Sequence, residues 1–417
     1  MAEPSTSKSF DIVLFGATSF VGQLTAEYLI SAYGVCPPTF KWAIAGRSEE
    51  KLLALKARLE KEVDPTAAGL ATIVADSYDG EALDRMVTQT KVVLTTVGPY
   101  LRYGSKLVAA CARAGVHYCD LTGESLWVVD MIDQYHEEAV RTGAKIVHSC
   151  GYDSIPADLG VFMMMEHVKE VHGTTATDVR NFMRDSKGGF SGGTLASALC
   201  TLDRLWKKWG STRRKLGDPL LLTPSTERPS GSQPGGFGYD FLAKAWTVMS
   251  IFGGHDSKMV YRSASFLRYP SFRYKQVFAF KGLSGFFTAV ISSTFLMVMG
   301  LLLVPPLTRN IIRRFLPAPG EGPSKEIRDK GYFWHDFIAT ATVDAKEVKV
   351  HGVVGSDKGD PGYKETAKMF AESSLCLALD EDKLASSKGG VLTPASAMGA
   401  ALLERLRKAG ITFKVVQ

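Results

Sequence analysis

The sequence predicts an α/β protein: an N-terminal doubly wound parallel sheet, followed by a second α+β domain that carries a hydrophobic, membrane-associating segment. Short apolar, β-branched runs alternate with segments of helical periodicity, which is typical of a parallel sheet covered by helices. A glycine-containing turn follows the first run, and a long uncharged stretch lies in the second half. The expected strands of the first sheet are residues 10–15, 41–45, 72–75, 92–96, 117–120 and 145–149.

Composition excludes several classes of protein. The 417 residues are 45% hydrophobic and 22% charged, with a formal net charge of +6. This balance is that of an ordinary folded protein and does not indicate a nucleic-acid-binding protein. The 6 cysteines form no C-x-x-C pair, and the 8 histidines show no metal-ligand spacing, so we expect no metal site. Residues 1–9 resemble neither a signal nor a transit peptide. We therefore expect a flexible tail and an intracellular location.

The turn after the first expected strand predicts a dinucleotide-binding Rossmann domain. A pyrophosphate needs exposed N–H groups at a helix N-terminus and residues small enough for close approach to the main chain. Ser19 occupies the usual place of the middle glycine, which leaves the tightness of binding open. The alternative is a tight turn without a ligand. The expected contacts are Gly16, Ala17, Thr18, Ser19, Phe20, Val21 and Gly22.

The next strand ends indicate which dinucleotide binds. No acid ends the second expected strand; Arg47 and Ser48 stand there, and arginine suits the 2′-phosphate of NADP(H). The alternative is a solvent-exposed arginine beside a capping serine. Asp76 ends the third strand and either meets the adenine end or begins a turn. The turn Val97, Gly98 and Pro99 follows the fourth strand and either approaches the nicotinamide or is only a structural turn.

Polar side chains after the fourth, fifth and sixth expected strands are candidate catalytic or substrate-binding groups, because the carboxyl ends of parallel strands face one crevice. A tyrosine there can stabilise a developing oxyanion, and a carboxylate can relay a proton or orient a substrate. The alternative is helix capping and solvated carboxylates. The catalytic candidates are Tyr100, Tyr118 and Asp153, and the substrate candidates are Asp120, Glu124, Ser154 and Asp158.

Several motifs, taken in order, resemble the saccharopine dehydrogenase-like oxidoreductases, which include the trans-acting enoyl reductases. They cover nearly the whole chain. The resemblance implies a Rossmann domain followed by a substrate or dimerisation domain, and it adds Gly193 and Thr194 as substrate contacts. The motifs are Gly16 to Gly22, Ala45 to Ser48, Val97 to Tyr100, Tyr118 to Glu124, Cys150 to Pro156, Ser191 to Thr194, Asp360 to Tyr363 and Gly389 to Ala395.

Two segments of the second half predict contact with lipid. Residues 195–215 form a basic amphipathic helix that packs on the core or lies on anionic lipid. No charge occurs between Lys281 and Arg309, so residues 283–304 are long enough to span a membrane, the alternatives being a buried core or dimer packing. A shallow, one-sided insertion fits better than a span, because the following segments are expected to complete the same α/β body.

These expectations define a domain plan. Residues 10–158 form the Rossmann domain and residues 159–417 form the substrate and dimerisation domain, which includes a flexible loop over residues 219–238. A helix over residues 395–408 packs back on the Rossmann domain.

The plan and the motifs together indicate a function. The leading hypothesis is an NADP(H)-dependent oxidoreductase at a membrane or lipid-droplet surface, acting on a hydrophobic, lipid-derived substrate, with enoyl reduction as the suggested reaction and a homodimer as a compatible assembly. The alternatives are a non-catalytic NADP-binding scaffold at a lipid surface and amino-acid metabolism of the saccharopine type.

Overall fold

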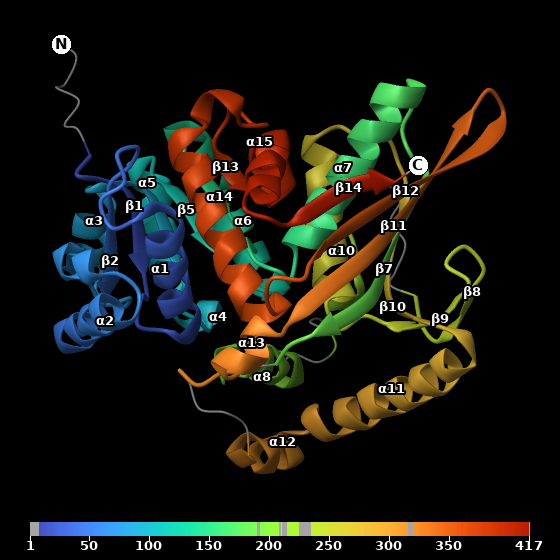
Figure 1. Cartoon of the computed structure of the whole chain (residues 1–417), viewed down its shortest axis with the longest axis horizontal. Helices are drawn as coiled ribbons and strands as arrows, with labels where there is room; N and C mark the ends of the chain where they lie inside the picture. Colours follow the sequence, from blue (N-terminus) through green and yellow to red (C-terminus); the bar gives the residue numbers. More distant parts are fainter. Residues whose placement is uncertain are drawn as a thin grey trace.

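A computed structural model describes residues 8–189, 192–207, 210, 215–224, 235–315 and 320–416. It contains two seven-stranded sheets. The sheets lie side by side, with helices α7, α14 and α15 between them (Figure 1). These helices are Ile155–His172, Thr366–Leu379 and Pro394–Lys408.

The first sheet confirms the predicted doubly wound parallel sheet. Its strand order is β13-β6-β5-β4-β1-β2-β3, and all of its pairs are parallel. All of the expected strands occur, within a few residues of the predicted ends. The strands are β1 Phe10–Phe15, β2 Trp42–Gly46, β3 Ala71–Val74, β4 Thr90–Thr95, β5 His117–Asp120, β6 Lys145–Val147 and β13 Gly390–Leu392.

Helices bury both faces of this sheet, which is why its strands are continuous apolar runs. Alternate residues of β1 enter two different cores: Ile12 and Leu14 pack with α1, α2 and α14, whereas Val13 and Phe15 pack with α3, α5 and α6. The helices are α1 Phe20–Tyr33, α2 Glu49–Glu62, α3 Gly80–Val87, α4 Tyr100–Tyr103, α5 Ser105–Ala114 and α6 Ser125–Thr142.

The C-terminal part of the chain completes the first sheet. Strand β13 pairs with β6 at the edge, and α14 packs against β1, β4 and β5. Glu372 of α14 accepts hydrogen bonds from the hydroxyls of Tyr28 and Tyr33, both at 2.6 Å, and pairs with Arg405 of α15 at 3.3 Å. The expected division at residue 158 therefore misses two elements of the first layer. The expected C-terminal helix is α15, which contacts α14, α7 and β6.

The second sheet is mixed, with strand order β14-β12-β11-β7-β10-β9-β8. Only the β7–β10 pair is parallel. Helices α7 and α10 cover one face of it. Gly160 of α7 makes this contact close, because a Cβ there would lie 2.3 Å from the ring of Phe337. The elements are β7 Asp178–Lys187, β8 Gly238–Asp240, β9 Ala245–Met249, β10 Arg273–Lys281, β11 Tyr332–Val343, β12 Lys346–Ser356, β14 Thr412–Val416 and α10 Gly253–Phe266.

The remaining helices lie at the lower edge of the molecule (Figure 1). Helix α8 forms the start of the expected amphipathic helix, and Arg204 binds both carboxylate oxygens of Asp130 on α6 at 2.9 and 3.3 Å. Residues 208–209, 211–214 and 225–234, which belong to the expected helix and loop, lie outside the described residues. The helices are α8 Gly192–Lys207, α11 Gly282–Leu303, α12 Pro306–Ile312 and α13 Lys325–Asp329. Short helical turns occur at Pro65–Gly69, Arg313–Phe315, Pro361–Glu365 and Glu381–Lys383.

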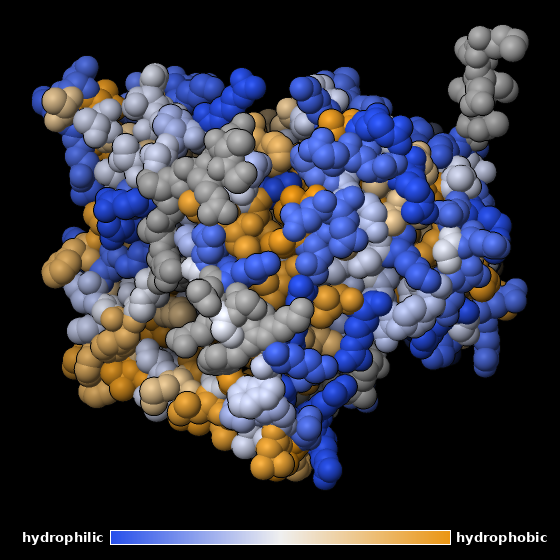
Figure 2. Space-filling model, turned by 180° about the vertical axis from the view of Figure 1, so that it is seen from behind, coloured by the Kyte–Doolittle hydropathy of each residue, from blue (hydrophilic) through white to orange (hydrophobic). Residues whose placement is uncertain are grey.

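The apolar segment forms helix α11, which is long and apolar enough to cross a membrane by length and composition alone. Only Gly285 and Ala289 are buried among its residues. A buried core position is therefore excluded. Figure 2 shows hydrophobic side chains gathered along the lower edge, where α11 and α12 lie.

Candidate active site

A cavity of about 250 Å³ lies between the carboxyl edge of the first sheet and the second sheet. This is where ligands of open α/β sheets bind. One part of its lining is polar, with hydroxyl groups and one carboxylate, and the other is apolar. The polar residues are Thr122, Ser149, Asp153, Ser186, Thr194, Tyr363 and Thr366; the apolar ones include Val21, Leu121, Ile251, Phe252, Phe278 and Pro361.

The glycine-containing turn beside this cavity has the geometry of a phosphate site. Gly16 has φ +84°, and a Cβ on Gly22 would lie 2.4 Å from the carbonyl oxygen of Gly16. Ser19 has an extended backbone that needs no glycine, and its hydroxyl accepts the Gly22 N–H and donates to Thr96 Oγ1 at 2.8 Å. At the start of α1 the N–H of Val21 has no helical partner, and Val21 lines the cavity. The turn therefore fits a dinucleotide pyrophosphate.

The three residues that were predicted to contact the adenosine end of the cofactor differ in their contacts within the chain. Arg47 at the end of β2 is exposed and has no ion pair with any described residue. The hydroxyl of Ser48 caps α2 by accepting the Lys51 N–H at 3.3 Å. Asp76 accepts the N–H of Tyr78 at 2.8 Å, which forms a turn. Arg47 is thus the group available for a 2′-phosphate.

The turn after β4 lies beside the glycine-containing turn. The side chain of Val97 packs so closely on Gly16 that a Cβ there would lie 2.7 Å away. A Cβ on Gly98 would be 3.7 Å from the hydroxyl oxygen of Ser197 on α8, and Pro99 precedes α4 as its N-cap residue. This turn thus lies between the phosphate site and the second half of the chain.

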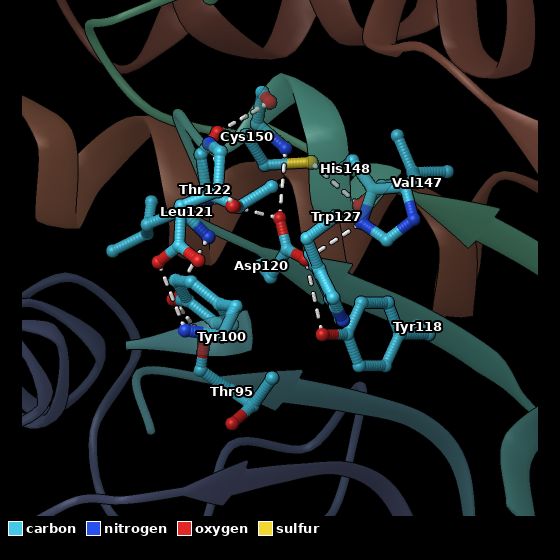
Figure 3. Close-up of polar contacts among 12 residues, drawn as sticks. Thr95, Tyr100, Tyr118, Asp120, Leu121, Thr122, Trp127, Val147, His148 and Cys150 are labelled. Carbon is cyan, nitrogen blue, oxygen red and sulfur yellow. Dashed lines mark hydrogen bonds and ion pairs between the residues drawn. The ribbon is translucent and has the colours of Figure 1, made fainter. Parts of the chain in front are cut away.

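Asp120 is the centre of a buried polar network (Figure 3). One of its oxygens accepts the Tyr118 hydroxyl at 3.0 Å and pairs with His148 Nδ1 at 2.7 Å. The other accepts the N–H groups of Thr122 and Ser149 at 3.1 and 2.9 Å. Asp120 and Tyr118 are both fully buried and do not line the cavity. The structure thus corrects their expected catalytic and substrate roles: they hold the β5 and β6 ends together.

Tyr100 is also a structural group, contrary to expectation. Its buried hydroxyl donates to the carbonyl oxygen of Thr95 and accepts the Leu121 N–H, both at 3.1 Å. Glu124 likewise turns away from the cavity, because its carboxylate accepts the N–H groups of Tyr100 and Leu101 at 3.0 and 2.8 Å. It thereby caps the N-terminus of α4.

Ser154 and Asp158 join α7 to its neighbours and are buried outside the cavity lining. Ser154 donates to Asp256 of α10 at 3.2 Å. Asp158 accepts a hydrogen bond from Ser263 of α10 and another, at 2.8 Å, from the N–H of Ala395 of α15. Burial raises the pKa of Asp158 to about 7. Their expected substrate role is therefore corrected to one of fixing helices.

Asp153 is the predicted residue that the structure places in the cavity as a charged group. Burial raises the pKa of its carboxyl to about 6, and its oxygens accept no hydrogen bond from the described part of the chain. Thr194 also lines the cavity, with its hydroxyl 3.2 Å from that of Tyr363. The neighbouring Gly193 is exposed outside the lining.

Tyr363 and His255 are site residues for which no role was predicted. Tyr363 belongs to a motif that the resemblance marked, so a signal existed. His255 bridges the hydroxyls of Ser125 and Ser149 at 2.8 and 2.9 Å, and burial lowers its pKa to about 3, so it is neutral. It fixes Ser149, a cavity residue with φ +64°. No motif surrounds His255 that would have indicated this contact.

The sheet order, the phosphate-type turn and the cavity define an oxidoreductase with a nicotinamide dinucleotide-binding domain. Comparison with known proteins agrees: the saccharopine dehydrogenase NADP binding domain family matches residues 12–147. A putative trans-acting enoyl reductase of Mycobacterium tuberculosis is 40% identical over 99% of both chains. A trans-acting enoyl reductase of Mycobacterium bovis is 37% identical over 97% of both. The chain therefore belongs to the saccharopine dehydrogenase-like family, in the group of the trans-acting enoyl reductases.

A solved structure shows the same fold. Saccharopine dehydrogenase (L-Glu forming) from Saccharomyces cerevisiae has a TM-score of 0.52 and 12% identity, covering 98% of this chain and 100% of the yeast chain. This likeness shows the fold alone.

Proposed function

We propose that this protein is an NADP(H)-dependent reductase that acts on a carbon–carbon double bond of a hydrophobic, lipid-derived substrate. The observation that carries the proposal is Asp153, which among the described residues is the single charged side chain in a lining of hydroxyl, aromatic and aliphatic groups. The names of the relatives support the reaction class.

Arg47 supports NADP(H) over NAD(H). Its guanidinium is exposed at the end of β2, where a 2′-phosphate would lie, and no carboxylate ends that strand to bind a ribose hydroxyl. Gly16 and Gly22 provide the close approach that the pyrophosphate needs. When bound, the cofactor supplies a hydride.

Asp153 would provide the proton. Reduction of an enoyl group adds hydride to the β-carbon and a proton to the α-carbon. A carboxyl with a pKa of about 6 keeps a protonated fraction near neutral pH and regains its proton readily. The hydroxyls of Tyr363 and Thr194 lie in the same lining and would orient the carbonyl next to the double bond.

The side chains of the cavity lining also indicate the class of substrate. A saccharopine-type amino acid carries several carboxylates, which binding sites meet with arginine or lysine. The described residues of the lining include neither. Phe252, Phe278 and Ile251 instead form a wall that suits an acyl chain. The exposed helix α11 supports action at a membrane or lipid-droplet surface.

The test is NADPH oxidation against enoyl thioesters of increasing chain length, with ketones and amino acids as comparison substrates. We expect turnover to increase with chain length. When the NADPH carries deuterium as its transferable hydride, mass spectrometry should find the deuterium at the β-carbon of the product and a solvent proton at the α-carbon. NADPH binding without turnover of any substrate would favour a non-catalytic scaffold, and preferred turnover of amino acids would favour saccharopine-type chemistry.

A further inference from the structure

Helix α11 presents its apolar side to solvent, which is the reverse of an ordinary surface helix. Six of its exposed large side chains recur at three- and four-residue steps, which places these six on one side of the helix. Leu283 is 78% exposed and Ile291 is 69% exposed, so nothing in the described chain covers this side. We call it the outer face of α11; it comprises Leu283, Phe287, Ile291, Phe295, Val298 and Leu301.

Both ends of α11 are attached to the same body. Strand β10 runs directly into α11 at Gly282. The chain then returns as β11, which pairs with β7, the strand that also pairs with β10. A spanning helix would place its ends on opposite sides of roughly 30 Å of hydrocarbon. The two flanks of α11 instead lie in one sheet.

The far end of α11 is held by Arg309 of α12. This buried guanidinium donates to the carbonyl oxygens of Leu303 and Val304 at 3.1 and 2.9 Å, and it pairs with Asp203 of α8 at 2.6 Å. Helix α8 is in turn joined to α6 through Arg204 and Asp130. The last turn of α11 is thus fixed to the part of the molecule that carries the first sheet.

The near end of α11 shares a sheet face with the cavity. Phe286 packs on Trp246, with ring centroids 4.8 Å apart, and Trp246 pairs across the strands with Phe280. Two residues earlier on the same face, Phe278 pairs with Val248 and forms part of the cavity wall. The apolar wall of the cavity therefore continues to the base of α11.

The charge around α11 indicates which lipid surface it fits. From Lys281 to Gly320 the chain has four cations, Lys281, Arg309, Arg313 and Arg314, and no acid. Lys281, Arg313 and Arg314 lie at the two ends of the α11–α12 segment and are accessible to solvent. Cations beside an apolar helix face are typical of helices that lie on anionic lipid.

We propose that α11 lies in the plane of an anionic lipid leaflet, with its outer face among the acyl chains and both of its ends on the same side of the membrane. This placement rests on the proposed function, in which the substrate comes from lipid. The half-exposed Ile251 stands at the mouth of the cavity. With α11 in the leaflet, that mouth would lie close to the lipid that supplies the substrate. The chain does not cross the bilayer.

The first test is flotation of the full chain with vesicles of phosphatidylcholine, with and without phosphatidylserine. We expect stronger binding to the anionic vesicles. The double variant Ile291→Glu/Phe295→Glu should bind at least about tenfold more weakly. The control Leu53→Glu/Val171→Glu places the same charges at exposed apolar positions outside the outer face and should bind like the parent. Equal binding by the two double variants would overturn the proposal.

The second test measures depth. A fluorescent label on a single cysteine at position 287, 295 or 302, in a Cys36→Ser background because Cys36 is the exposed native thiol, is quenched by lipids that carry a shallow or a deep spin label. An in-plane helix gives stronger quenching by the shallow label at every position. Deep quenching at 295 with shallow quenching at 287 and 302 would show a spanning helix and overturn the proposal.

Vesicle binding and enzyme activity are measured separately, so either proposal can fail without the other. NADPH affinity and turnover of a short, water-soluble enoyl thioester should be the same in Ile291→Glu/Phe295→Glu and in the parent. Absence of turnover in the parent would contradict the proposed function and leave the vesicle result intact. The parent could instead form a dimer in solution and fail to bind vesicles, and this variant could dissociate that dimer. Such a result would overturn the placement on lipid, because the outer face would then be a contact between copies.

Discussion

Asp120 and Asp153 follow neighbouring strands of one parallel sheet, β5 and β6, and both lie at the carboxyl edge where ligands bind. Asp120 accepts hydrogen bonds from Tyr118, His148 and two backbone N–H groups and is fully buried. Asp153 accepts none from the described residues, and its carboxyl lines the cavity. Position at the sheet edge therefore does not separate a structural carboxylate from a reactive one; the donors around it do.

The two carboxylates differ in what replaces the hydrogen bonds to water that each loses on burial. Hydrogen bonds to Asp120 replace its lost solvation. No such donors reach Asp153, so burial raises its pKa, and the group stays able to exchange a proton with a ligand. Substitutions of the two carboxylates test this contrast.

Asp120→Ala should lower the free energy of unfolding by about 3–5 kcal/mol, because it leaves Tyr118, His148 and two N–H groups with no acceptor. Asp153→Ala is the matched control and should not lower it, because no described group donates a hydrogen bond to the Asp153 carboxylate. Urea denaturation followed by circular dichroism measures both. Similar losses in the two variants would contradict the contrast.

Asp153→Asn should lower kcat for an enoyl substrate about 100-fold, because the amide cannot donate the proton. In the parent, activity should fall as the pH rises through about 6, the pKa of the Asp153 carboxyl, since only the protonated form donates. The variant should lack this limb of the pH profile, with its NADPH dissociation constant unchanged. A variant that keeps the parent's kcat and pH profile would exclude Asp153 as the donor.

Arg47→Ala should weaken NADPH binding about tenfold and leave NADH binding unchanged, because the charge-assisted contact involves the 2′-phosphate alone. Fluorescence titration measures both dissociation constants. Lys51→Ala removes a nearby cation on α2 and should affect neither. Equal weakening of NADPH and NADH binding would contradict the assignment of Arg47.

The smallest effect concerns stability against pH. A carboxyl whose pKa is about 6 in the folded state and about 4 in the unfolded chain favours folding fully only below pH 4. That contribution is lost as the pH rises through 6. Asp153→Asn should therefore be more stable than the parent at pH 8 and nearly equal to it near pH 4. Thermal unfolding at the two pH values measures this difference, and equal stability at pH 8 would contradict it.

The sequence predicts the first sheet well because the information is local. The apolar runs of β1 to β6 are continuous, and the turn from Gly16 to Gly22 stands between a strand and a helix. Arg47 could be identified for the same reason, since it ends a strand at a known place in this fold. The position of α11 also followed from a local feature, which is the absence of charge between Lys281 and Arg309.

The errors share a physical cause, which is that burial depends on distant partners. Tyr100, Tyr118 and Asp120 carry the chemistry of an active site, but Thr95, His148 and the chain turns use up their hydrogen-bonding capacity. The same holds for Asp158, which binds groups on α10 and α15. His255 reaches Ser149 from another part of the chain, and no local pattern reports such a contact.

The place of β13 and α14 has a consequence for how the protein folds during synthesis. Strands β1 to β6 of the first sheet leave the ribosome early. The sheet nevertheless keeps an open edge at β6 and an uncovered face until Gly390 and the residues after it have emerged. Its nascent form therefore exposes apolar surface and unpaired strand groups for most of translation. A chain that stops short of β13 would be expected to lose the cofactor-binding layer along with the C-terminal elements, and to depend on chaperones until degraded.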